Sequence, residues 1–135
     1  MSLRMIAAFV WTSLLLVACW IPAGWLRVNE SQVHVGISHI DKLVHGILFA
    51  GFGFLWIQAA RSRKELIWVP VAGVILAVLT EFGQGLPIVG RDTDALDGLA
   101  DIVGLVVGLV VGLGGAYVLN GRRLGLESGR LENEV

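Results

Sequence analysis

The sequence predicts an all-α integral membrane protein, folded as a polytopic bundle of four transmembrane helices. Hydrophobic residues make up 56% of the 135 residues and charged residues only 16%, against about 25% charged in a typical soluble domain. The charges cluster between four long apolar segments, from about residue 5 to 26, 43 to 60, 66 to 86 and 96 to 119. About 20 apolar residues span a bilayer, and a backbone in lipid has to satisfy its hydrogen bonds within the segment. Each segment is therefore expected to be a helix.

The first segment has two interpretations. Arg4 followed by an apolar stretch resembles a signal peptide, and the residues from Leu16 to Cys19 resemble a lipoprotein cleavage box. The apolar stretch nevertheless continues past Cys19 to Trp25. We therefore expect an uncleaved first span, with Cys19 as a small buried residue.

The third segment cannot cross a bilayer on apolar residues alone. Its apolar run, Leu66 to Thr80, has 15 residues, or about 22 Å of helix at ~1.5 Å per residue. A bilayer core is about 30 Å thick, so this helix carries Glu81 and Gln84 into or near the hydrocarbon. A carboxylate there costs roughly 2.5 kcal/mol or more and usually marks a functional site.

The distribution of Lys and Arg predicts the orientation. One side of the membrane receives seven of them: Arg4, Arg61, Arg63, Lys64, Arg122, Arg123 and Arg130. The other side receives three: Arg27, Lys42 and Arg91. We therefore expect both termini in the cytoplasm, with residues 1–119 as the membrane domain and residues 120–135 as a polar cytoplasmic tail, either a surface helix or disordered.

This topology brings the unusual polar residues to one depth, at the boundary of the outer leaflet. Residues three or four apart share a helix face. The contributions are Asp41, Lys42 and His45 from the second helix, Glu81 and Gln84 from the third, Arg91 from the loop, and Asp97 and Asp101 from the fourth.

Several of these residues also have structural explanations. Asp41 favours the amino terminus of a helix, His45 could be a satisfied interior histidine, and Glu81 could pair with Arg91. Asp101 lies a full turn inside its apolar segment, where capping does not account for it. Glu81 lies at a helix carboxyl end, the unfavourable pole for an acid.

Small residues recur every fourth position of the last segment, at Ala100, Gly104, Gly108, Gly112 and Ala116. This spacing lets two helix backbones approach closely in lipid. We expect tight packing within the monomer; a homodimer through Gly104, Gly108 and Gly112 is the alternative.

The motifs, taken together and in order, resemble those of the VanZ-like family of small bacterial membrane proteins. The matching motifs are Asp41-Lys42-x-x-His45, Glu81-x-x-Gln84, Arg91, and Asp97-x-x-x-Asp101-x-x-Gly104 with Gly108. The resemblance covers residues 40–112 and implies a four-helix protein of the bacterial cytoplasmic membrane with a role at the cell envelope. The family takes its name from a member tied to resistance to the glycopeptide teicoplanin. The family usually has asparagine where this chain has Asp101.

The first functional hypothesis is a protein that binds an envelope lipid or a lipid-linked precursor. Lys42 and Arg91 would hold an anionic head group, with Asp41, Gln84 and Asp97 completing the ligand-binding set. A net charge of −1 indicates no nucleic-acid partner.

Two other classes of function stay open. A membrane-embedded hydrolase or transferase acting on a lipid-linked phosphate would use His45, Glu81 and Asp101 as catalytic residues, and the carboxylates could gather a divalent metal as cofactor. A structural or assembly subunit of a membrane complex would use the same residues to lock its helices together. Proton-coupled transport is a further alternative, which would need a dimer.

Overall fold

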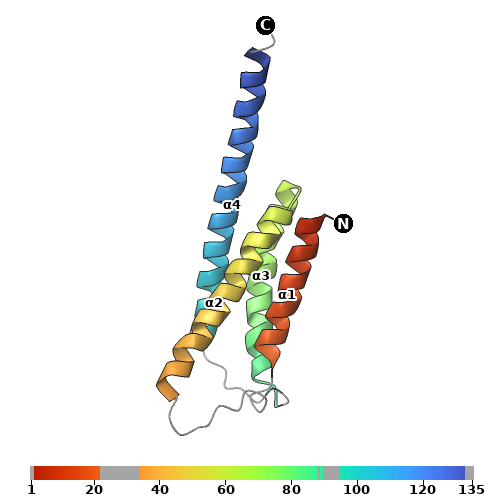
Figure 1. Cartoon of the computed structure of the whole chain (residues 1–135). Coiled ribbons are helices and arrows are strands. Elements are labelled where there is room, and N and C mark those ends of the chain that lie inside the picture. Colours follow the sequence, from red (N-terminus) through yellow and green to blue (C-terminus); the bar gives the residue numbers. More distant parts are fainter. Residues whose placement is uncertain (1, 22–33, 88, 90–94, 133–135) are drawn as a thin grey trace.

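The protein is a bundle of four antiparallel helices (Figure 1). The computed structural model describes the backbone of residues 2–21, 34–87, 89 and 95–132, and the side chains of the same ranges except 34–40 and 119–132. The helices are α1 (Leu3–Trp20), α2 (His34–Ala59), α3 (Arg63–Gln84) and α4 (Ala95–Glu132). No strand occurs among the described residues. The predicted all-α class and four-helix bundle are confirmed.

All four helices are long and apolar enough to cross a membrane. The spans are Leu3–Trp20, Asp41–Ala59, Arg63–Gln84 and Ala95–Val118. Large apolar side chains cover the outside of the bundle; Phe82 is 71% exposed, Ile67 66% and Val78 64%. A soluble protein rarely exposes such a continuous apolar surface, whereas lipid solvates it. The chain is therefore a multi-pass membrane protein.

The two ends of the bundle differ in chemistry. The amino-terminal end of α1 and the carboxyl-terminal end of α4 point the same way, and the short connection between α2 and α3 lies at that end too (Figure 1). Arg4 reaches this connection, since its Nη1 donates to the Gln58 carbonyl at 3.4 Å. The basic residues Arg4, Arg61, Arg63 and Lys64 therefore gather at one end, and the motif residues of α2, α3 and α4 lie toward the other.

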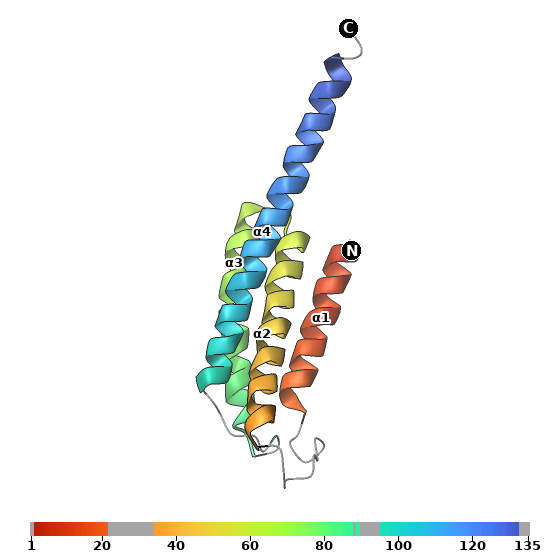
Figure 2. The same ribbon diagram turned by 60° about the vertical axis from the view of Figure 1, so that its left-hand side comes forward.

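The fourth helix is longer than the sequence predicts for a membrane span. It continues as one helix from Ala95 to Glu132 and extends beyond the other three (Figure 2). Of the two alternatives for the polar tail, helix or disorder, the structure shows helix as far as Glu132.

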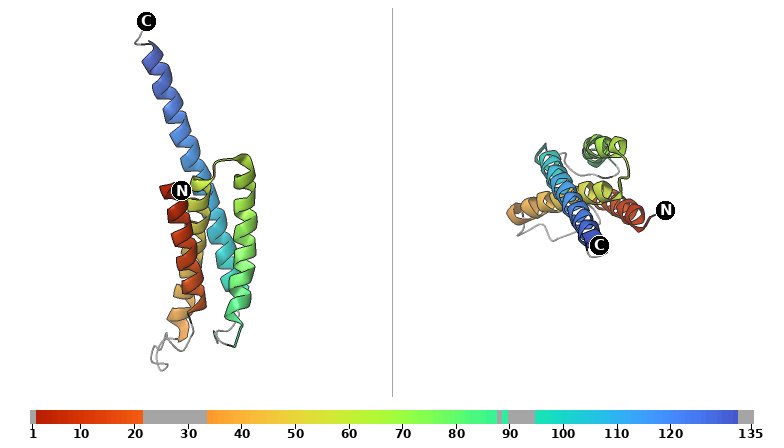
Figure 3. Two further views of the ribbon diagram at one scale, coloured as in Figure 1. Left: turned by 90° about the vertical axis from the view of Figure 1, so that its right-hand side faces the viewer. Right: turned by 90° about the horizontal axis from the view of Figure 1, so that it is seen from above.

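The closest packing joins α2 to α4. A Cβ atom added at Gly104 would lie 2.8 Å from the Gly46 Cα atom, and one added at Gly108 would lie 2.9 Å from the Ala50 Cα atom, with the carbonyl oxygens closer still. Viewed along the bundle, α4 crosses over α2 (Figure 3). Gly104, Gly108 and Gly112 all meet α2 of the same chain, so packing inside the monomer accounts for these three glycines.

Indole donors tie α1 to α2. Trp11 Nε1 donates to the Leu48 carbonyl at 2.8 Å, and Trp56 Nε1 donates to Thr12 Oγ1 at 3.0 Å. Both indole groups lie within the span, where a donor without a partner would cost free energy. Cys19, which is 1% exposed, packs in the core with Leu15 and Phe49. The sequence predicts this buried position for the cysteine.

Candidate functional site

Six side chains gather where α1 and α3 end and the membrane spans of α2 and α4 begin. We call them the polar cluster: Asp41, Lys42, His45, Gln84, Asp97 and Asp101. Four of them are almost fully buried, with His45 2% exposed, Gln84 1%, Asp97 6% and Asp101 0%. A buried polar group needs hydrogen-bond partners, so the contacts within the cluster determine what it can do.

His45 is at the centre of a hydrogen-bonded chain. Its Nδ1 lies 2.9 Å from Asp101 Oδ1, and its Nε2 lies 3.3 Å from the Gln84 amide nitrogen. The same amide nitrogen donates to the Cys19 carbonyl at 3.4 Å. Because an amide nitrogen only donates, His45 Nε2 accepts, and Nδ1 carries the proton that Asp101 accepts. One chain of contacts thus links α4, α2, α3 and α1.

The local packing explains why His45 and Asp101 meet. Gly46 follows His45 on α2, and Gly104 lies one turn after Asp101 on α4. These two glycines bring the helix backbones into contact, which places the two side chains within hydrogen-bond distance across the contact.

Asp101 has one unmet acceptor. Its Oδ2 is buried and has no hydrogen-bond partner among the described residues. A buried carboxylate oxygen without a partner is expensive, so this atom points to a group that is not part of the described protein, such as a water, a proton or a cation.

Lys42 and Asp97 form an ion pair at the edge of the cluster. Lys42 Nζ lies 3.1 Å from Asp97 Oδ1, and the lysine side chain is 21% exposed. Asp41 lies close by: one oxygen of Asp41, one ring nitrogen of His45 and one oxygen of Asp97 fall within 4.8 Å of one another.

Glu81 lies beside a cavity between α3 and α4 that opens to the outside of the bundle, where its lining residues Phe82 and Val78 are exposed. The cavity has a volume of about 410 Å³, and the residues that line it are Ala77, Val78, Glu81, Phe82, Gly98 and Ile102. Gly98 lies between Asp97 and Asp101 in the sequence, and Glu81 lies one turn before Gln84. An apolar cavity therefore adjoins the polar cluster at the same depth in the bundle.

The structure brings together six of the eight predicted site residues and places Glu81 beside them. The eighth, Arg91, lies outside the described residues. Sequence reasoning did not single out the Cys19 carbonyl, Thr12 or Trp11 as polar partners. Trp11 and Thr12 carried a signal, because an indole donor or a hydroxyl in the middle of a span needs an acceptor.

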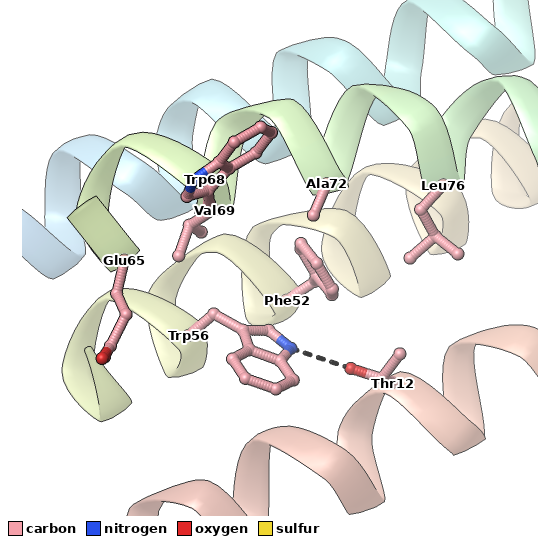
Figure 4. A pocket seen from close by; sticks show the side chains of 8 residues that line it. All are labelled: Thr12, Phe52, Trp56, Glu65, Trp68, Val69, Ala72 and Leu76. Atoms are coloured by element: carbon pink, nitrogen blue, oxygen red, sulfur yellow. Dashed lines mark hydrogen bonds between the residues drawn. The ribbon is translucent and has the colours of Figure 1, made fainter. Parts of the chain in front are cut away.

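A second cavity lies in the other half of the bundle, among α1, α2 and α3. It has a volume of about 380 Å³ and is lined by Thr12, Phe52, Trp56, Glu65, Trp68, Val69, Ala72 and Leu76 (Figure 4). Two of its polar side chains are already engaged: Thr12 accepts from Trp56, and Glu65 Oε2 accepts from the Arg61 amide at 2.7 Å. This cavity offers apolar volume without convergent polar groups.

Comparison of the chain with known protein families, with curated proteins and with solved structures finds no match.

His45 is shielded from direct contact with a substrate. Both ring nitrogens are occupied within the protein, and the side chain is 2% exposed. A general acid or base has to reach the substrate directly or through one water, and here Gln84 stands at the ring nitrogen that would do so.

Proposed function

We propose that this chain is a VanZ-like protein of the bacterial cytoplasmic membrane that binds an envelope lipid or a lipid-linked precursor. The orientation proposed has both termini in the cytoplasm and the polar cluster at the outer boundary. This orientation is supported by the basic residues that gather at the end of the bundle where Arg4 and Lys64 lie, because basic residues accumulate on the cytoplasmic side of a membrane.

The observation that carries the proposal is the apolar cavity beside Glu81. A volume of about 410 Å³ falls within the range of small-molecule sites, which combine apolar walls with a few polar groups. An acyl or prenyl chain would occupy the space against Val78 and Ile102. Its head group would lie at the end where Glu81 and the polar cluster supply acceptors.

The cluster suits a head group that donates hydrogen bonds, such as a sugar hydroxyl, an amide or an amine. Carboxylates outnumber ammonium groups in it, and Lys42 is already paired with Asp97 at 3.1 Å. A phosphate would therefore depend on Arg91. The proposed ligand is a lipid-linked sugar or peptide, with recognition concentrated on its hydroxyl and amide groups.

A structural role is the second candidate, because the chain from Asp101 through His45 and Gln84 to the Cys19 carbonyl joins all four helices. This role predicts no dependence on the cavity. Filling the cavity while leaving the chain of hydrogen bonds intact therefore separates the two candidates.

Gly98→Leu fills the cavity. A Cβ atom at Gly98 meets nothing within 4 Å, so the larger side chain enters the open volume without displacing backbone. Gly114→Leu is the matched control, because Gly114 lies on the same helix, also has nothing within 4 Å of an added Cβ, and does not line the cavity.

The experiment is native mass spectrometry of the detergent-purified protein after incubation with a bacterial lipid extract that contains polyprenyl-linked sugars. The wild type and Gly114→Leu should retain one lipid per chain, and Gly98→Leu and Glu81→Gln should retain at least about tenfold less. Equal retention by all four proteins would refute lipid binding at this cavity and leave the structural role.

A further inference from the structure

We propose that the polar cluster holds a divalent transition-metal ion, with Asp41, His45 and Asp97 as its protein ligands. The three residues offer two carboxylate oxygens and one imidazole nitrogen, all within 4.8 Å of one another. Ligands about 2.1 Å from a tetrahedral metal lie about 3.4 Å apart. His45 has to offer Nε2, because its Nδ1 is engaged by Asp101, so the Gln84 amide moves aside when the ion binds. Small side-chain rotations then bring the three ligand atoms to coordination distance.

The helices that supply these ligands are already fixed against each other. Asp41 and His45 are one turn apart on α2, and Asp97 lies on α4. The contact between Gly46 and Gly104 joins the same two helices where a Cβ would not fit. A site on two rigid elements needs little ordering when the ion binds.

Asp101 is an independent indication of a cation. Its carboxylate is 0% exposed and directed at His45, with Oδ1 2.9 Å from Nδ1. Its Oδ2 is buried with no hydrogen-bond partner among the described residues. A carboxylate that accepts from a histidine ring is also the usual support of a metal-binding histidine, because it fixes the ring and raises its basicity.

The charges of the cluster point the same way. Among the described residues of the cluster, the three carboxylates of Asp41, Asp97 and Asp101 outnumber the one ammonium group of Lys42. A divalent cation would add positive charge where these carboxylates meet. Lys42, 3.1 Å from Asp97, acts as a partial substitute for that cation, and its partly exposed side chain can withdraw toward water.

The ligand chemistry selects among metals. Imidazole suits zinc and iron, and carboxylates suit manganese, whereas calcium takes six to eight oxygens and soft ions prefer thiolates. Mn²⁺ and Zn²⁺ are therefore the probes, and Ca²⁺ is the negative comparison.

The experiment titrates Mn²⁺ and Zn²⁺ into protein that was purified without a histidine tag and stripped with a chelator. Bound metal is counted by elemental analysis, and Mn²⁺ affinity is followed by electron paramagnetic resonance. The wild type should bind one ion per chain, and Asp97→Asn should bind at least about tenfold more weakly. Glu65→Gln, a carboxylate change at the other end of α3, should bind like the wild type.

Lys42→Met tests the proposal through an expected gain of metal affinity, which a loss of folding would not produce. Removal of the competing ammonium group should raise metal affinity, whereas a cluster with a purely structural ion pair gains nothing from this change. Absence of saturable binding in both the wild type and Lys42→Met, or equal affinity in the wild type and Asp97→Asn, would overturn the proposal. Gly98→Leu should keep its metal, so a failure of lipid binding is distinguishable from a failure of metal binding.

Discussion

Gly104→Ala tests whether the contact between α2 and α4 positions the polar cluster. The added Cβ would lie 2.8 Å from the Gly46 Cα atom, whereas two carbon atoms pack at about 3.5 Å or more. The helices must therefore separate locally by at least about 0.7 Å, because the Gly46 carbonyl oxygen lies closer still and neither backbone can rotate away as a side chain would.

This separation also acts on the cluster. His45 precedes Gly46, and Asp101 lies one turn before Gly104, so the bond between them crosses the same contact. A bond of 2.9 Å lengthened by at least about 0.7 Å exceeds the range of a hydrogen bond. Overpacking costs about 1–3 kcal/mol, and a hydrogen bond between membrane helices contributes about 0.6–1.7 kcal/mol. We expect Gly104→Ala to lower the free energy of unfolding by about 2–4 kcal/mol.

The assay is reversible unfolding in mixed micelles of increasing dodecyl sulfate content, followed by tryptophan fluorescence. Gly98→Ala is the matched control on the same helix, because its Cβ meets nothing within 4 Å. It should be neutral or stabilising by up to about 1 kcal/mol, since alanine is the better helix former. A Gly104→Ala protein within about 0.5 kcal/mol of Gly98→Ala would refute the proposed packing contact.

Three further changes probe the hydrogen bonds directly in the same unfolding assay, with metal removed by chelation. Asp101→Asn should be neutral or stabilising, because the amide oxygen still accepts from His45 while the buried charge is gone; a loss above about 1 kcal/mol would contradict this reasoning. Gln84→Leu should destabilise by about 1–3 kcal/mol, because it leaves buried acceptors without their donor, and unchanged stability would show that the amide contacts contribute nothing. Thr12→Val should cost about 0.5–1.5 kcal/mol, because Trp56 loses its acceptor with little change of volume, and a hydrogen-exchange or ultraviolet resonance Raman signal of an unbonded indole should accompany the loss.

The expected result for Asp101→Asn bears on the charge of the polar cluster. An asparagine at this position could satisfy His45 without adding a charge. The aspartate of this chain adds a buried negative charge and an acceptor, Oδ2, without a partner among the described residues. With an aspartate at this position we expect the cluster to bind a cation more tightly than with an asparagine, and the metal titration measures this difference.

The sequence alone was sufficient for the fold class and for the end of the bundle at which the polar residues of the spans lie. Lipid forces each apolar segment to be helical, so segment length and composition decide the spans with little competition from other folds. The alternation of direction then places Asp41, His45, Gln84, Asp97 and Asp101 at one end of the bundle, because they lie near the same end of successive spans. The spacing of Gly104 and Gly108 indicated a close helix contact in the same way.

Only the tertiary structure decided which residues pair and which partner each glycine meets. Helix rotation is not fixed by hydropathy, because lipid solvates apolar side chains on every face about equally well. Sequence therefore could not separate His45, bonded to Asp101 and Gln84, from Glu81, which lies beside the cavity of α3 and α4. It also left open which helix of the bundle Gly104 meets, and the structure places Gly104 against the backbone of Gly46 on α2.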